Sequence, residues 1–157
     1  MKKLLLISLI LTLFSFTAHA QQGGFRAGVH AGLPLSDASD ISSVNLGADV
    51  NYLFNVTDRV ALGASTGYSA FLGKDDFDTY SYIPVAFSGR ASYGANIFYA
   101  ADVGYAIALD SYTDGGLLYQ AKLGYTNNFL DAFVFYKGIS ADGATIAAVG
   151  LGVGFKL

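Results

Sequence analysis

The stretch Ala144–Leu157, ATIAAVGLGVGFKL, alternates between two kinds of residue along its whole length. One set of alternate positions is mostly bulky and apolar: Thr145, Ala147, Val149, Leu151, Val153, Phe155 and Leu157. After Ile146, the other set is nearly bare: Ala148, Gly150, Gly152, Gly154 and the terminal charge Lys156. Alternate residues of a strand face opposite sides of the sheet, so this stretch predicts a strand with one apolar face and one small, polar-ended face.

The same alternation recurs along the chain, and no sustained helical period follows residue 20. It predicts eight strands, at residues 25–33, 44–54, 60–69, 81–93, 97–109, 117–126, 131–138 and 144–157. In the segment 131–138 the charges Asp131 and Lys137 share a parity with Phe133 and Phe135. Both of its faces therefore carry bulk, and the pattern leaves its register and facing open.

The N-terminal segment has the features of a secretory signal. Lys2 and Lys3 precede the apolar run Leu4–Phe16, and Ala18-His19-Ala20 forms a small-residue cleavage site. The run is shorter than the roughly 20 residues that a membrane-spanning helix needs. We therefore expect a cleaved signal peptide at residues 1–20 and one domain at residues 21–157, exported without any cysteine.

The charges of the expected mature chain are mainly acidic. Removal of Lys2 and Lys3 leaves seven basic residues against twelve acidic ones, all aspartates, for a net charge of −5. No basic patch is available for a nucleic acid, so we expect no nucleic-acid partner.

The lengths of the strands and connections predict a membrane barrel. An even number of strands, each near 9–11 residues, is typical of tilted strands that cross an outer membrane. The connections 55–58, 94–96 and 127–130 are short, whereas 34–43, 71–80, 110–116 and about 139–143 are longer. Short periplasmic turns and longer external loops are typical of such barrels, and this topology places both termini in the periplasm.

Aromatic residues are expected to gather at two levels of this topology. The predicted periplasmic belt contains Phe25, Tyr52, Phe54, Tyr93, Tyr99, Tyr125, Phe129 and Phe155. The predicted outer belt contains Tyr68, Phe71, Tyr80, Tyr82 and Tyr119. The sequence thus predicts an all-β, eight-stranded antiparallel up-and-down transmembrane β-barrel whose apolar face contacts lipid.

On this pattern, on Tyr82-Ile83-Pro84-Val85 and on the terminal Gly154-Phe155-Lys156-Leu157, the chain resembles the small outer-membrane β-barrel family typified by OmpX and the membrane domain of OmpA. The resemblance implies a porin-like integral protein in the outer membrane of a Gram-negative bacterium, in contact with outer-membrane lipids. It also implies that the barrel-assembly machinery reads the last strand through Val153, Phe155 and Leu157. Family members commonly end in an aromatic residue. In this chain the aromatic residue, Phe155, lies two positions before the last residue, Leu157.

Charged side chains are expected inside the barrel. The parity of the strands turns six of them inward: Arg26, His30, Asp49, Arg90, Asp102 and Lys122. An eight-stranded barrel has an interior just wide enough for side chains to fill. Buried charges need partners, so we expect a structural network that includes Asn45, Asn51 and Gln120. The many inward glycines keep a narrow channel for water, ions or small solutes as the alternative, because they leave room or permit close strand approach.

Two other kinds of function have some support in the sequence. Some small barrels are lipid-modifying enzymes that use a histidine, a serine and an acid, and His30 is followed by Ser36, Asp37 and Asp40. Adjacency in sequence does not supply hydrogen-bond reach, so we expect neither catalysis nor a cofactor. A soluble lipocalin-like binder is the other alternative, and it predicts that the outward positions tolerate charge.

The predicted outer loops are acidic and contain one base, Lys74. Their aspartates are Asp37, Asp40, Asp75, Asp76, Asp78, Asp110, Asp114 and Asp142. Such clusters bind divalent cations or are simply hydrated, and no loop matches the twelve-residue calcium pattern. We assign no metal site, and expect a structural or surface-interaction role in which these loops contact a surface ligand or divalent cations.

Overall fold

The computed structural model describes residues 24–35, 38–74, 77–109, 115–141 and 143–157. The expected signal peptide at residues 1–20 lies outside the described residues. The strands are β1 (Gly24–Leu35), β2 (Ser42–Asn55), β3 (Val60–Gly73), β4 (Tyr80–Tyr93), β5 (Ile97–Ala108), β6 (Gly116–Thr126), β7 (Leu130–Ala141) and β8 (Ala144–Lys156). A one-turn helix, α2 (Ala38–Ile41), lies between β1 and β2. No helix among the described residues is long and apolar enough to cross a membrane.

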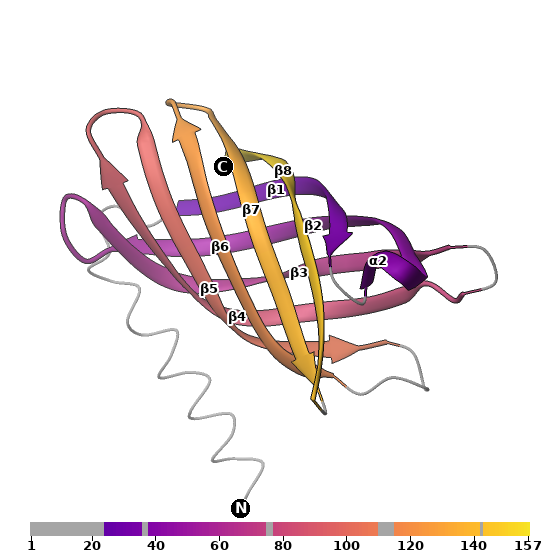
Figure 1. Ribbon diagram of the computed structural model, residues 1–157. Coiled ribbons are helices and arrows are strands. Elements are labelled where there is room, and N and C mark those ends of the chain that lie inside the picture. Colours follow the sequence, from indigo (N-terminus) through magenta and orange to yellow (C-terminus); the bar gives the residue numbers. More distant parts are fainter. Residues whose placement is uncertain (1–23, 36–37, 75–76, 110–114, 142) are drawn as a thin grey trace, which may run out of the picture.

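The eight strands form one sheet that closes on itself (Figure 1). Each strand pairs antiparallel with the next, and the terminal stretch in β8 pairs with β1, placing Val29 opposite Val153. Closure leaves no unpaired edge, which is the condition for a sheet inside a lipid bilayer. The predicted eight-stranded up-and-down barrel is confirmed.

The wall is apolar outside and polar inside. Val103 and Leu151 project outward and are 55% and 66% exposed. Their neighbours of the opposite parity point inward, where Asp102 is only 3% exposed. The apolar faces predicted for the strands therefore form the outer surface, which is the arrangement of a barrel solvated by lipid.

The facing of β7 is decided by its two neighbours. Its ladder pairs Lys137 with Gln120 of β6, while Phe133 and Phe135 lie opposite Gly152 and Gly150 of β8. All four odd-numbered residues from Asp131 to Lys137 point inward and are buried. The bare face of β8 accepts this bulk, because a methyl group built on Gly152 would overlap the Phe133 ring.

The two ends of the barrel differ. The turn end carries the short connections 56–59, 94–96 and 127–129, and the loop end carries 36–41, 74–79, 109–115 and 142–143. Helix α2 lies at the loop end, beside the β3–β4 connection (Figure 1). The last connection was predicted to be long, at about 139–143, but it contains two residues, since β7 and β8 stay paired up to Ala141 and Ala144. The strands contain 11–14 residues, more than expected, because ladder pairing also continues where the wall meets water.

Two members of the predicted outer aromatic belt are placed differently. Phe71 and Tyr82 are 1% and 0% exposed and lie inside the barrel. Phe71 was expected in a loop, but β3 continues through it and turns its ring inward. Tyr68 is exposed on the outside, as expected for a belt residue.

Candidate functional site in the barrel lumen

The lumen contains all six charged residues that the strand parity turned inward. They come from β1, β2, β4, β5 and β6, and β7 adds Asp131 and Lys137. These residues contact one another at three levels between the turn end and the loop end of the barrel.

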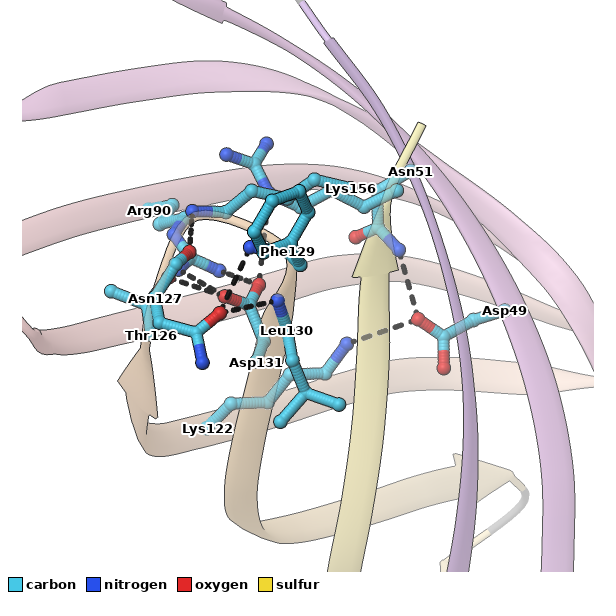
Figure 2. A network of polar contacts seen from close by, with 11 residues as sticks. Asp49, Asn51, Arg90, Lys122, Thr126, Asn127, Phe129, Leu130, Asp131 and Lys156 are labelled. Carbon is cyan, nitrogen blue, oxygen red and sulfur yellow. Dashed lines mark hydrogen bonds and ion pairs between the residues drawn. The ribbon is translucent and has the colours of Figure 1, made fainter.

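At the turn end, Arg90 and Asp131 face each other across the lumen (Figure 2). Arg90 Nη1 donates to Asp131 Oδ2 at 2.7 Å and Nη2 donates to Oδ1 at 3.1 Å. Thr126 Oγ1 donates to the same Oδ1 at 2.5 Å, and Arg26 Nε lies 3.7 Å from Oδ2. The Arg90 guanidinium also lies 3.6 Å from the centre of the Phe98 ring. A bidentate pair that crosses the lumen ties β4 to β7, two strands that are not neighbours in the sheet.

In the middle of the lumen, Lys122 bridges two carboxylates. Its Nζ lies 3.1 Å from Asp102 Oδ2 and 3.5 Å from Asp49 Oδ2. Ser88 donates to Asp102 at 2.5 Å, and Asn51 donates to Asp49 at 2.8 Å. Ser88 satisfies Asp102 Oδ1, which Lys122 does not contact, and Asn51 adds a second donor to Asp49 Oδ2. A buried ion pair requires such additional hydrogen bonds.

Toward the loop end, a histidine links Asp49 to Lys137. Lys137 Nζ donates to His30 Nε2 at 2.7 Å, so the imidazole carries its proton on Nδ1 and donates to Asp49 Oδ1 at 3.2 Å. Lys137 also donates to Ser69 Oγ at 3.3 Å, and Asn45 donates to the same hydroxyl. Polar contacts thus run continuously from Asn45 to Asp102.

Above this level, apolar side chains fill the lumen at the loop end. Phe71, Tyr82, Leu118 and Ile139 are each at most 2% exposed and belong to one buried cluster. Ala38 of α2 belongs to the same cluster and is fully buried. We call these five residues the apolar stopper.

Most inward glycines allow neighbouring side chains to pack against the backbone of the wall, and they do not leave open space in the lumen. A methyl group at Gly47 would overlap the His30 ring, and one at Gly124 would overlap the Phe98 ring. The spaces left between these side chains are small. One cavity of about 30 Å³ lies between the turn end and the Lys122 level, and another of about 20 Å³ lies between the Lys122 level and Tyr82. A water molecule needs roughly 10–15 Å³, so the first space has room for two or three waters and the second for one or two.

Asp131 and Lys137 are the lumen charges that the sequence left unassigned. Their parity was shared with Phe133 and Phe135, which by bulk alone suited either face. The feature of the sequence that identifies them is the row of glycines on the inward face of β8. These glycines leave space for the rings of Phe133 and Phe135 on the neighbouring strand, so the face of β7 that carries these rings points inward.

The other predicted residues lie outside the lumen or outside the described part of the chain. Val153, Phe155 and Leu157 of the proposed assembly signal project outward. Ser36 and the loop aspartates other than Asp40 and Asp78 are not among the described residues. His30 contacts Asp49 and Lys137, not Asp40. Within the described ranges, no group of three or more His, Cys, Asp or Glu residues is placed to hold a metal ion.

No family model matches the sequence, and no curated protein matches it. Solved structures do. Ail, the attachment invasion locus protein of Yersinia pestis, is 12% identical over 86% of this chain and 97% of its own, with a TM-score of 0.64. Neisserial surface protein A is 10% identical over 86% of this chain and 95% of its own, with a TM-score of 0.55. The N-terminal β-barrel domain of Pseudomonas aeruginosa OprF is 15% identical over 87% of this chain and all of that domain, with a TM-score of 0.52.

At these identities the similarity is one of fold. The chain has the fold of small outer-membrane transmembrane β-barrels, as its strand pattern predicted.

Proposed function

We propose that this protein is a small integral outer-membrane barrel of a Gram-negative bacterium, with a filled lumen and a structural or surface-interaction role through its acidic loops. In this orientation the turn end and both termini face the periplasm, and the loop end faces outside. The observation that carries the proposal is the packing of the lumen, where side-chain contacts run from Arg90 to the apolar stopper. The spaces between them hold at most two or three waters each.

Conductance in a planar lipid bilayer tests the filled lumen. We expect the protein to insert without stepwise conductance. The variant Phe71→Ala/Ile139→Ala, which shortens two residues of the apolar stopper, should leak ions more often, whereas Phe77→Ala, at an exposed aromatic outside the strands, should not. Regular steps from the unaltered protein would instead support the narrow channel.

The charge of the loops narrows the class of surface partner. Ail has been solved in complex with the heparin analogue sucrose octasulfate, a polyanion. Here the expected outer connections contain eight aspartates and one lysine, so we infer a cationic partner or divalent cations at this face and repulsion of polyanions.

Binding to the protein in lipid nanodiscs tests the loop proposal. Polylysine should bind in a salt-sensitive way, and heparin should not bind. Asp75→Asn/Asp76→Asn should weaken polylysine binding, whereas Asp58→Asn, at an exposed aspartate of the turn end, should leave it unchanged. Equal weakening by both variants would show that the loops are not the contact surface.

The final strand and the leader complete the proposal. Removal of residues 1–20 during export, and recognition of Val153, Phe155 and Leu157 by the assembly machinery, are supported by the sequence pattern and by the outward facing of these side chains. Phe155→Ala should lower the yield of inserted barrel in cells more than it lowers the stability of the refolded protein.

A further inference from the structure

The charges at the turn end of the lumen do not balance. Arg26 and Arg90 lie within ion-pair distance of the Asp131 carboxylate there, and a third cation, Lys156, donates to the Asn127 carbonyl oxygen at the same end. Arg26 and Lys156 are directly opposed partners on β1 and β8, and both belong to inward positions. Like charges directly opposite each other on a sheet destabilise the pairing. This arrangement calls for negative charge beyond that of Asp131.

Asp131 has no capacity left for Arg26. Its Oδ1 accepts from Thr126 and Arg90, and its Oδ2 accepts from Arg90. Arg26 Nε is 3.7 Å from Oδ2, too far for a hydrogen bond, and it is buried without a hydrogen-bond partner among the described residues. A buried donor without an acceptor is costly, so Arg26 points to an acceptor that the described part of the chain does not supply.

Arg26 borders the cavity of about 30 Å³ described above. Arg90, Lys122 and Asn51 also line it and carry more N–H groups than they donate to carboxylates, whereas the Ser88 hydroxyl donates to Asp102. Asp49 and Asp131 also line it, but each of their carboxylate oxygens already accepts a hydrogen bond. Opposed glycines of β1 and β8, Gly28 and Gly154, form its bare side.

We propose that this cavity binds one halide ion, with chloride as the natural ligand. The volume suits a single monatomic ion or two or three waters, and is too small for a polyatomic anion such as phosphate. A halide accepts hydrogen bonds from several donors at once and supplies the missing negative charge. Its site lies beside the turn end, and the partly exposed Arg26 side chain offers a route from solvent. The site rests on the lumen geometry alone and is independent of the partner proposed for the loops.

Unfolding of the purified protein in detergent micelles tests the site. Urea unfolding is compared in sodium chloride and in sodium gluconate at constant ionic strength, so that screening is the same and gluconate is too large to enter the cavity. Above the dissociation constant, each tenfold rise in chloride should raise the ratio of folded to unfolded protein about tenfold. Arg26→Gln should abolish this dependence, whereas Arg59→Gln, at an exposed arginine of the 56–59 turn, should retain it.

A second variant fills the cavity without removing charge. A methyl group at Gly154 would lie 3.7 Å from Asp131 Cβ, an ordinary contact, so Gly154→Ala should fold and lose most of the chloride dependence. Crystals of the unaltered protein soaked in bromide should show an anomalous peak beside Arg26 Nε, which decides the matter even if Arg26→Gln does not fold. Equal unfolding in chloride and gluconate, or a water without an anomalous peak at this position, would overturn the proposal.

Discussion

At the scale of single residues, Asp131 is the carboxylate that pairs with the arginines at the turn end of the lumen. It is 4% exposed and accepts hydrogen bonds from Arg90 and Thr126 while pairing with Arg26. Asp131→Asn removes the only carboxylate within ion-pair distance of either arginine among the described residues. Breaking a buried pair by removing one partner costs about 3–5 kcal/mol, and we expect a loss of this size in urea unfolding of the protein in lipid vesicles.

Asp58→Asn is the matched control for this residue, because Asp58 is exposed on the 56–59 turn. It should change the free energy of unfolding by no more than about 0.5 kcal/mol. If both variants lose the same small amount, the Arg90–Asp131 pair does not stabilise the barrel.

At the scale of the strand, the outward face of β8 and β5 is the face that we expect to contact lipid. Leu151 and Val103 of β5 lie near the middle of their strands and project outward. In lipid, Leu151→Arg or Val103→Arg should each destabilise the barrel by about 2–4 kcal/mol and impair its insertion. Val56→Arg, at a similarly exposed valine on a turn, should have little effect. Unaltered folding of both strand variants in liposomes would instead favour a soluble lipocalin-like protein.

At the scale of the whole molecule, closure between β1 and β8 removes the free edges that would otherwise let detergent or another chain begin to separate the strands. We therefore expect the unheated barrel to stay folded in dodecyl sulfate and to migrate differently from the boiled chain on a gel. The measurement is electrophoretic mobility before and after heating, on protein recovered from the outer-membrane fraction. Identical mobility, or recovery in the soluble fraction, would contradict a closed membrane barrel.

The sequence predicted the fold well because strand parity is a local property. Whether Val103 or Asp102 faces lipid follows from alternation alone, and the strand number followed from counting such segments. Loop lengths were predicted less well. Pairing between β7 and β8 continues up to Ala141 and Ala144, so their connection has two residues. The residue types at 139–143 do not predict so short a connection.

The sequence predicted which charged residues lie in the lumen, but not which of them contact one another. Alternation turned Arg26, His30, Asp49, Arg90, Asp102 and Lys122 inward, yet it carries no information on which of them meet across the barrel.

By itself, then, the sequence determined that a ring of eight strands would present an apolar outside and a charged inside, since each strand carries that division in its own residues. The packing of the strands around the lumen sets the inward facing of Asp131 and Lys137 on β7, the pairing of Arg90 with Asp131, and the lack of an acceptor for Arg26 Nε among the described residues. These are contacts between strands far apart in the chain, and they depend on the register in which the barrel closes.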